Sequence, residues 1–582
     1  QGTGGSLINN TILGEYAAGI YLSSATQVTL QDNQINNTQY VGIEVSGSAI
    51  DYFNHTIGPD NLVEGLPVVY NFSLSNQSVF ENVDLTSTYG QVICAWCNNV
   101  TYDNVTLRKD GLSLYRTYDS SVTNSNITSD SGMGIYWYFG NGSIINNTIT
   151  TYNPYGVGIY TYYVNPVNIT NNIINTYNSS STSVYLFSST DSYVVNNNIN
   201  THGGDTASYG VYSSSLNILV SGNMINSSGF GVFLSSQDNS TIQNNVIYTT
   251  GSDADGINLF NTVVNNITGN NITAMGSSAY GIELNIASNN YLTNNIIRTY
   301  GSQYGYGINF ISNSNNNTLT GGSIVTNGST ESYGLYLYSG LSNNISNVNI
   351  SALNSDDLRF GSGSAEFSNV TFDKNNVSFD SGATGNLTVQ WYLDVNVTNS
   401  SGPLENANVS VYNVSLDLIN NSLTDVTGFI ETLTLTEFWQ NASEKVYHTP
   451  HSINTTLTGY TTNSTTINLT ETNSTQVNIL LSQEGEGPLA CGNISSNITF
   501  TENLTATGDC FTINVSDITI DGAGFSLIGN GSGIAFNITS QDNVTIRNFA
   551  GINNFSTAVY GYSLNNSNIS NNTINGSTAL AT

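Results

Sequence analysis

Paired acidic residues are the side chains in this sequence whose types and spacing could do chemistry. Asp356 and Asp357 are adjacent, and Asp253 and Asp255 stand two residues apart, directly before Gly256. Paired carboxylates act as acid and base in polysaccharide hydrolysis, and Asp-x-Asp-Gly resembles the start of an oxygen-ligand loop for Ca²⁺. The companion blocks of such hydrolases and the closing glutamate of such a loop are absent. We therefore predict no catalytic residue, and either a Ca²⁺ site at Asp253 and Asp255 or a plain solvated turn.

Basic residues are too few and too scattered for most other chemistry. His448 and His451 form the only close histidine pair, and no third ligand stands near them in the sequence. The five arginines lie far apart, whereas a lyase needs a basic residue placed to take the α-proton. We expect the histidine pair to lie in a surface loop.

The four cysteines form two close pairs, which fits an oxidising location. Cys491 and Cys510 flank a short stretch, and a disulfide that closes such a loop stabilises a fold by about 3 kcal/mol. Cys94 and Cys97 form a Cys-x-x-Cys pair without the helix start that activates a thiol. This pair predicts a local disulfide or two buried thiols.

The charge balance excludes several classes of protein. Eight Lys and Arg residues face 39 Asp and Glu residues, a net charge of −31, and only 8% of residues are charged. Nucleic-acid binding needs a basic footprint, and a helical bundle needs far more Glu, Lys, Arg and Leu. The 36 Tyr and 21 Phe residues argue against disorder. No run of 18 or more apolar residues is present, so we expect no membrane span in this segment.

Asparagine glycosylation sequences are dense along the whole chain. About 45 Asn-x-Ser/Thr acceptors occur between Asn9 and Asn575. This density predicts an extracellular protein that carries N-linked glycans, although Asn-rich turns account for part of the count. The candidate acceptors are Asn36, Asn54, Asn71, Asn126, Asn146, Asn168, Asn226, Asn239, Asn327, Asn396, Asn441, Asn463 and Asn537.

A repeat of 21 to 27 residues runs through the chain between residues 111 and 360. Each unit has a small residue, three or four β-forming residues, a polar turn, and then Asn-Asn-x-Ile, as in Gly158-Ile-Tyr-Thr and Asn172-Ile-Ile174. This period with short strands and no helix signal predicts a parallel β-helix. Asparagine tolerates the left-handed backbone of a corner, and its amide can form ladders between coils.

The repeat pattern divides the chain into three parts, all of them β-structure. The same pattern extends back to residue 1 and predicts a first β-helix over 1–383. Longer alternating strands over 388–482 predict a small antiparallel β-sandwich. A Gly- and Glu-rich linker leads into 486–582, where the coil pattern resumes as the start of a second β-helix.

Tyrosines recur at equivalent strand positions, as Tyr136, Tyr160, Tyr185, Tyr212 and Tyr336 do. Such residues form aromatic ladders, either packed within the protein or exposed on one face. An exposed ladder could bind glycans by ring stacking. We expect the packed form.

The two ends of the chain fit one another in register. Joining Thr582 to Gln1 produces one further coil, with the Asn-Asn-x-Ile spacing kept. We therefore expect head-to-tail stacking of copies, or tandem units in a longer polypeptide, both of which give a fibre. The alternative is a β-helix cut at arbitrary points. The candidate interface residues are Asn9, Ile12, Ile20, Ile574 and Leu580.

The Gly-Ile-Tyr and Asn-Asn-x-Ile coils resemble the right-handed β-helix repeats of NosD-type and carbohydrate-binding proteins. The block from Asn61 to Tyr70 resembles one common in archaeal surface proteins with these repeats, and 388–482 resembles the immunoglobulin-like or carboxypeptidase-regulatory-like modules attached to them. The resemblance implies a structural surface protein, an S-layer or filament subunit that binds copies of itself. A carbohydrate-binding adhesin, or a polysaccharide lyase or hydrolase, is the alternative. The scarcity of histidine and methionine argues against the copper chemistry that NosD suggests.

Overall fold

The structure is a computed structural model that describes residues 4–14, 18–36, 40–204, 207–470, 473–483, 490–576 and 579–581. Short β-strands joined by tight corners make up most of it, and the one helical element in these residues is a 3₁₀ turn, Ile50–Phe53. The chain forms two compact units, Gln1–Trp391 with Thr436–Tyr447, and Tyr392–Leu435 with His448–Thr582. No helix within the described residues is long and apolar enough to cross a membrane.

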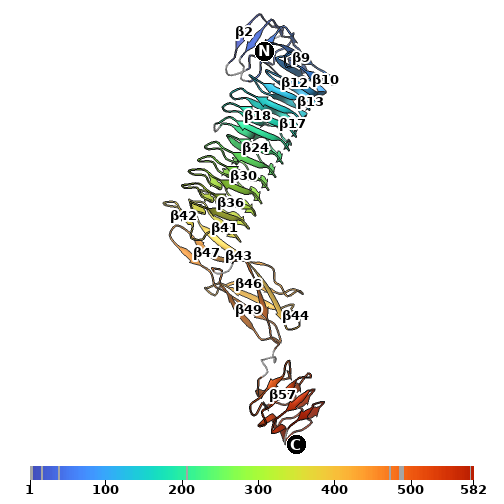
Figure 1. Ribbon diagram of the computed structural model, residues 1–582, viewed down its shortest axis with the longest axis vertical. Helices are drawn as coiled ribbons and strands as arrows, with labels where there is room; N and C mark the ends of the chain where they lie inside the picture. Colours follow the sequence, from blue (N-terminus) through green and yellow to red (C-terminus); the bar gives the residue numbers. More distant parts are fainter. Residues whose placement is uncertain are drawn as a thin grey trace. The chain divides into compact units, whose positions relative to one another are not determined.

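The main part of the first unit is a parallel β-helix with three faces, in which each strand pairs with its counterpart one coil later (Figure 1). The strands of the first face are β9 (Leu66–Phe72), β11 (Gln91–Ala95), β13 (Leu112–Thr123), β15 (Ile135–Ile145), β17 (Val157–Thr170), β19 (Thr182–Phe187), β22 (Tyr209–Ser214), β25 (Phe230–Ser235), β28 (Ile257–Phe260), β31 (Ile282–Asn285), β34 (Ile308–Ile311), β37 (Leu335–Leu337), β40 (Leu358–Phe360) and β42 (Val377–Phe379). The long strands β13, β15 and β17 continue round a corner into the second face.

The other two faces complete each coil. The further strands of the second face are β10 (Ser75–Asp84), β12 (Asn98–Leu107), β20 (Tyr193–Val195), β23 (Leu219–Ser221), β26 (Thr241–Gln243), β29 (Asn266–Thr268), β32 (Tyr291–Thr293), β35 (Thr318–Thr320), β38 (Asn343–Ser346) and β41 (Ala365–Ser368). Those of the third face are β14 (Asn126–Ser129), β16 (Thr148–Thr151), β18 (Ile173–Tyr177), β21 (Asn198–His202), β24 (Met224–Ser227), β27 (Val246–Thr249), β30 (Asn271–Ala274), β33 (Ile296–Thr299), β36 (Ser323–Thr326) and β39 (Asn349–Ala352).

The Asn-Asn-x-Ile motif has a separate structural role for each of its residues. Asn196 takes a left-handed backbone at the corner, with φ of 55°, a conformation that asparagine tolerates better than most residues. Asn197 is buried inside the corner, and Ile199 is fully buried in the core. The motif therefore fixes the turn, the polar ladder and the packed interior of one coil at once.

A ladder of buried asparagines joins successive coils. The side-chain Nδ2 of Asn172 donates to Oδ1 of Asn197 at 3.0 Å, and the backbone N–H of Asn172 donates to the same oxygen at 2.8 Å. The same contact recurs along the buried residues Asn147, Asn172, Asn197, Asn223, Asn245, Asn270 and Asn295. Because each amide satisfies the next, the ladder holds the register of the coils without leaving buried polar groups unpaired.

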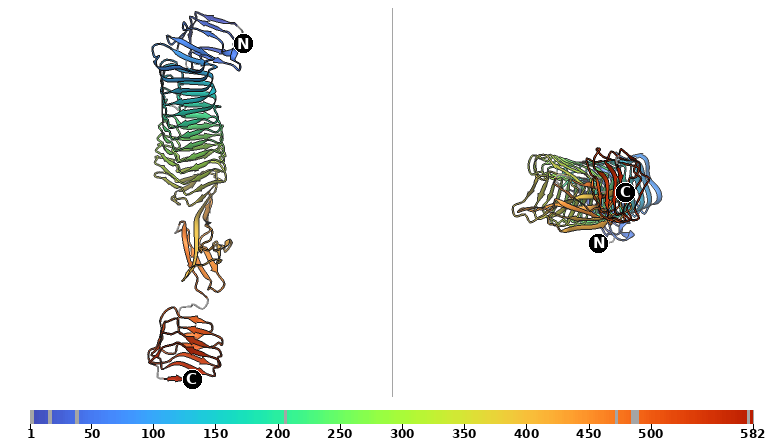
Figure 2. Two further views of the ribbon diagram at one scale, coloured as in Figure 1. Left: turned by 90° about the vertical axis from the view of Figure 1, so that its right-hand side faces the viewer. Right: turned by 90° about the horizontal axis from the view of Figure 1, so that it is seen from below.

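Residues 4–63 form a separate short stack of coils that is not continuous with the main one. Its strands are β1 (Ser6–Ile8), β2 (Thr11–Leu13), β3 (Ile20–Ser23), β4 (Thr29–Gln31), β5 (Gln34–Asn36), β6 (Ile43–Ser46), β7 (Thr56–Ile57) and β8 (Leu62–Val63). Strand β8 pairs antiparallel with β9 through a two-residue turn at Glu64 and Gly65, with φ of 50° and 80°. Positive φ at both positions is the signature of a type I′ hairpin, so the chain reverses where 1–383 was expected to run as one β-helix (Figure 2).

The region after the first β-helix continues its second face through β43 (Leu387–Asn399), which pairs with β41, and adds one separate small sheet. Strand β43 is parallel to β51 (Thr475–Leu480) and antiparallel to β44 (Gly402–Pro403). A four-stranded antiparallel sheet contains β46 (Leu418–Leu423), β45 (Asn408–Tyr412), β49 (His451–Thr456) and β50 (Asn463–Ile467). Strand β47 (Leu433–Gln440) pairs with β48 (Lys445–Tyr447). The parallel β43–β51 pair differs from the wholly antiparallel arrangement expected over 388–482.

A second β-helix with three faces begins at Cys491. Its first face has β52 (Gly492–Ile494), β55 (Phe511–Ile513), β58 (Ile534–Thr539), β61 (Thr557–Tyr562) and β64 (Ala579–Ala581). Its second face has β53 (Ile498–Thr499), β56 (Thr519–Asp521), β59 (Thr545–Arg547) and β62 (Asn568–Ser570). Its third face has β54 (Leu504–Thr505), β57 (Ser526–Ile528), β60 (Gly551–Asn553) and β63 (Ile574–Asn575).

A disulfide between Cys491 and Cys510 closes the first coil of this second β-helix. We expect the Cys491→Ser/Cys510→Ser variant to lower the free energy of unfolding of this part by about 3 kcal/mol, because the open loop gains entropy in the unfolded chain. Hydrogen exchange of β55 and β58 measures the effect locally. Protection of β28 and β31 in the first unit serves as the internal control, and equal loss of protection in both places would contradict the assignment.

Candidate functional site

The outward side of the first face carries one continuous row of side chains. In order along the coils, the register pairs Tyr136, Tyr160, Tyr185, Tyr212, Phe233, Asn258, Glu283, Asn309, Tyr336 and Arg359. The row is aromatic at its start, polar over three coils in the middle, and charged at its end. It is the most chemically varied surface of the first unit and therefore the candidate site.

The aromatic part of the row begins with stacked rings. The ring centroids of Tyr136 and Tyr160 lie 5.4 Å apart at 25°, and those of Tyr160 and Tyr185 lie 4.7 Å apart at 18°. Tyr185 and Tyr212 then meet edge to face, 4.6 Å apart at 79°. A neighbouring exposed stack contains Tyr152, Tyr177 and His202. A ring whose faces are covered, such as Tyr160, offers its edge to solvent, whereas sugar stacking uses the face of a ring.

The N-terminal coils cover the beginning of this row. The Tyr115 hydroxyl donates to the Ile43 carbonyl oxygen at 3.1 Å, and Tyr136 donates to the Glu44 carboxylate at 3.3 Å. The Gln91 side chain accepts the Ile43 N–H at 2.8 Å and donates to the Ile43 carbonyl at 3.0 Å. This part of the aromatic row is therefore packed inside the first unit, as expected for a packed ladder.

Two acidic groups are buried where the N-terminal coils meet the main stack. Burial raises the pKa of Asp110 well above its usual value, and the charge of the nearby Glu64 raises this pKa further. The hydrogen bond that Asp110 accepts from the Gly42 N–H acts in the opposite direction and lowers the pKa. Burial also raises the pKa of Glu44, while the hydrogen bond from Tyr136 lowers it. Sequence reasoning missed Asp110, because its partner Gly42 lies in the other stack, 68 residues away.

These raised pKa values predict acid-stabilised docking of the N-terminal coils. Above about pH 4 the Asp110 and Glu44 carboxyl groups lose their protons in the unfolded chain but keep them in the folded protein. The free energy of unfolding therefore falls as the pH rises towards the raised pKa values. We expect a higher melting temperature of the first unit at pH 5 than at pH 7, measured by calorimetry. Asp110→Asn should flatten this slope, and a melting temperature that rises with pH would contradict the prediction.

A pair of buried carboxyl groups lies at the polar middle of the row, Glu283 in the row and Asp255 beside it. Asp255 is 2% exposed and Glu283 is 9% exposed. Asp255 accepts the Tyr280 N–H at 2.9 Å and the Asn258 side chain at 2.8 Å. Asp253, by contrast, is exposed on the corner beside Ser252. The sequence singled out Asp255 but not Glu283, which stands one coil later in Gly281-Ile-Glu-Leu.

The charged end of the row is a closed network of ion pairs. Arg359 Nε lies 2.7 Å from the Asp380 carboxylate and its guanidinium lies 3.7 Å from Asp356. Tyr336 donates to Asp380 at 2.8 Å. Asp357 is buried apart from these groups and accepts the N–H groups of Ala352 and Asp373. The adjacent Asp356 and Asp357 therefore have separate partners. Burial raises the pKa of Tyr336, so its hydroxyl group keeps its proton and is unsuited to act as a base.

Soft metal ligands do not gather anywhere in the described residues. Within the described ranges, no group of three or more His, Cys, Asp or Glu side chains lies in a metal-binding arrangement. The ring of His202 is stacked on Tyr177, and Met224 and Met275 are exposed on separate coils. Copper binds imidazole, thiolate and thioether groups that converge, so the residues present do not fit a copper site. The structure joins Cys94 to Cys97 in a local disulfide, which occupies both sulfurs.

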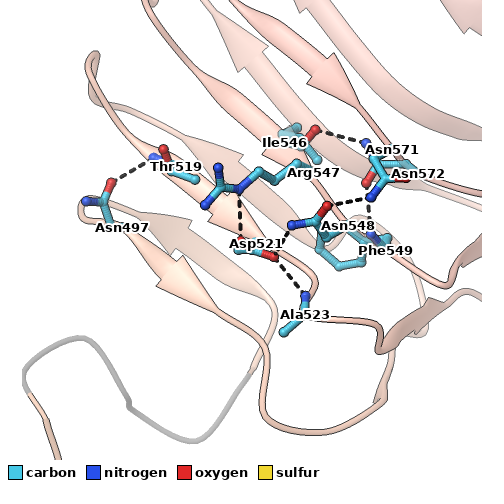
Figure 3. A network of polar contacts seen from close by, with 10 residues as sticks. All are labelled: Asn497, Thr519, Asp521, Ala523, Ile546, Arg547, Asn548, Phe549, Asn571 and Asn572. Atoms are coloured by element: carbon cyan, nitrogen blue, oxygen red, sulfur yellow. Dashed lines mark hydrogen bonds and ion pairs between the residues drawn. The ribbon is translucent and has the colours of Figure 1, made fainter.

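The second β-helix has its own polar network on the second face (Figure 3). Arg547 Nε lies 2.9 Å from the Asp521 carboxylate, which also accepts Asn548 Nδ2 at 3.0 Å. Partial desolvation raises the pKa of Asp521, but the hydrogen bonds from Ala523, Asn548 and Arg547 outweigh it and lower the pKa overall. Asn571 continues the contact to Asn548 at 2.7 Å. The network joins three coils of the second β-helix.

The glycosylation acceptors differ in exposure. Asn71 has a buried Nδ2, the atom to which a glycan attaches, so its geometry disfavours modification. The exposed acceptors are Asn54, Asn126, Asn146, Asn226, Asn239 and Asn327, and the half-buried ones are Asn36, Asn71, Asn168, Asn396, Asn441, Asn463 and Asn537.

The residues expected at an assembly interface lie on terminal coils. Asn9 is exposed, Ile12 and Ile574 are half-buried, and Ile20 is 5% exposed. Leu580 lies in β64, and its side chain falls outside the described residues.

Comparison with known proteins supports the fold class. The family model described as a right handed beta helix region matches residues 90–247, and that of the periplasmic copper-binding protein NosD matches residues 200–300. No curated protein matches this chain. The expected all-β, right-handed parallel β-helix, of about 22 turns, is confirmed.

Several solved structures share this fold at low similarity. A variant of the periplasmic alginate epimerase AlgG is 14% identical, with a TM-score of 0.37, over 50% of this chain and 77% of that one. The surface adhesin PfbA of Streptococcus pneumoniae is 16% identical, with a TM-score of 0.30, over 52% and 83%. The tailspike protein of E. coli bacteriophage HK620 is 12% identical, with a TM-score of 0.36, over 69% and 86%.

Proposed function

We propose that this chain is a structural protein of the cell surface whose β-helices stack end to end in an extracellular assembly. The observation that carries the proposal is the continuity of the ladders. Buried asparagines and stacked tyrosines each contact the same residue type one coil later. These asparagine and tyrosine side chains therefore hold neighbouring coils together. A catalytic or glycan-binding site would instead leave such side chains free to contact a ligand.

Open strand edges at two coils support assembly by stacking. Within the described part of the N-terminal coils, strands β1, β2 and β3 pair on one side only, with β4, β5 and β6. Strands β62, β63 and β64 also pair on one side only among the described residues. Unpaired edges are templates for further strands, and both coils have three short faces. In this proposal Asn9, Ile12 and Ile20 meet Ile574 and Leu580 of the next unit, whether that unit is another copy or a tandem repeat.

The test is a change at one edge that leaves the coil's own pairing intact. The Asn568 N–H is bonded inward to Val544 at 2.8 Å, so in a parallel strand the N–H of the next residue, Ile569, faces the open edge. Ile569→Pro removes that donor, and Ile569→Ala keeps it. We expect the unchanged chain and Ile569→Ala to form filaments in electron micrographs and Ile569→Pro to sediment as a monomer.

Two outcomes would overturn this proposal. If the chain remains monomeric at every concentration in sedimentation and electron microscopy, assembly by stacking of coils is ruled out. Saturable binding of a defined oligosaccharide by that monomer would favour the adhesin alternative, and turnover of a polysaccharide would favour a lyase or hydrolase.

A further inference from the structure

Asp255 and Glu283 form an unusual pair of buried carboxyl groups on two successive coils. Asp255 is held by the Tyr280 N–H and by Asn258 Nδ2, and Glu283 Oε1 accepts Asn285 Nδ2 at 3.2 Å. In the ion pairs of the described part of the chain, neither carboxyl has a Lys, Arg or His partner. Buried acids without a cation are costly when ionised.

Two unpartnered amide oxygens flank Glu283 in the same row. Asn258 and Asn309 pair in register with Glu283 on its two sides, one coil before and one coil after. They are 6% and 3% exposed, and the Oδ1 atom of each is buried without a hydrogen-bond partner. Because the Asn258 Nδ2 atom is bonded to Asp255, its Oδ1 atom lies beside the carboxyl pair. Two buried acceptors without a partner beside a buried carboxyl pair leave room for a water or a cation that accepts their lone pairs.

Tyr280 lies beside the carboxyl pair. The rings of Tyr280 and Tyr306 are stacked 5.0 Å apart at 3°, and Tyr306 is 7% exposed. They limit the access of bulk water to the acids, which strengthens any electrostatic interaction there.

We propose that Asp255, Glu283, Asn258 and Asn309 bind one Ca²⁺ ion between the coils of β28, β31 and β34. All four supply oxygen atoms, and two carboxylates balance the charge of a divalent cation. Ca²⁺ accepts six to eight oxygen ligands in flexible geometry and can be completed by water, whereas Mg²⁺ demands a near-ideal octahedron. Asp253 is not part of this set, so the site differs from the Asp-x-Asp-Gly turn that the sequence suggested.

The test is calorimetric titration of the chelator-treated chain with CaCl₂, with MgCl₂ as the comparison. We expect one saturable Ca²⁺ site and a rise in melting temperature. Glu283→Gln should weaken binding by about tenfold or more, while Asp253→Asn should leave it unchanged. Terbium luminescence excited through tyrosine gives a second readout of the same site.

Asn309→Ala separates loss of the ion from a folding defect. This variant removes an oxygen atom that accepts no hydrogen bond in the folded protein, so the fold should be kept. It should also weaken binding, with the melting temperature of the ion-free protein retained. The proposal is overturned if Glu283→Gln and Asn309→Ala bind Ca²⁺ as the unchanged chain does. It is equally overturned if Asp253→Asn loses as much affinity, because binding would then reflect the general negative charge.

Discussion

Asn197→Ala should be among the most destabilising single substitutions in the first unit. Its Oδ1 accepts two hydrogen bonds from Asn172, and its Nδ2 donates to the carbonyls of Ile169 and Val195 and to Asn223. Alanine leaves these groups buried and unpaired, at about 1–3 kcal/mol for each buried group. We expect the free energy of unfolding to fall by about 4 kcal/mol in urea titrations.

A neighbouring asparagine provides the matched control. Asn226 lies one coil further on, in β24, and its side chain is exposed. Asn226→Ala should change stability by less than about 0.5 kcal/mol. Equal effects at the two positions would show that the buried ladder contributes no more to stability than an exposed asparagine does.

Lys374→Met should be the second large effect, because it leaves a buried acid without its cation. Glu437 has a side chain that is 1% exposed, and its Oε2 lies 2.6 Å from Lys374 Nζ and accepts Trp391 Nε1 at 2.6 Å. Removing one partner of a buried ion pair costs about 3–5 kcal/mol. Unfolding followed by the fluorescence of Trp391 reports on this place directly.

A double variant separates the ion pair from simple packing. Glu437→Gln keeps an oxygen for Trp391 but removes the charge, so the Lys374→Met/Glu437→Gln variant should recover most of the stability that Lys374→Met loses. A double variant as unstable as the sum of its two single variants would mean that the two side chains act independently.

The coil architecture was predictable because each coil repeats its own physical requirements. Gly231 can have no side chain at its position, since a Cβ atom there would lie 2.4 Å from the Gly256 carbonyl oxygen of the next coil. Asn-Asn-x-Ile similarly encodes a left-handed corner, a ladder amide and a core residue. Short-range rules of this kind appear in the sequence at every coil.

Contacts that depend on reversal of the chain were not predictable in the same way. The Glu64-Gly65 turn is a short polar turn like many others in this sequence, and the coil pattern is alike on both sides of it. The packing of Ile43 against Gln91 and Tyr115 therefore left no periodic signal. The partner of Asp255 could have been found, because Asn258, Glu283 and Asn309 stand one coil apart in sequence.

The coil-to-coil ladders also determine how the main β-helix responds to a mechanical pull. Each coil contacts only its two neighbours, so tension along the axis of the stack loads the bonds between coils, and the coil at the loaded end detaches first. A released coil of 25 residues, such as that from Asn172 to Asn197, supplies about 80 Å of extended chain in place of a rise of about 4.8 Å. We expect the stack to lengthen in steps under load and to absorb work at each step, rather than to break at once.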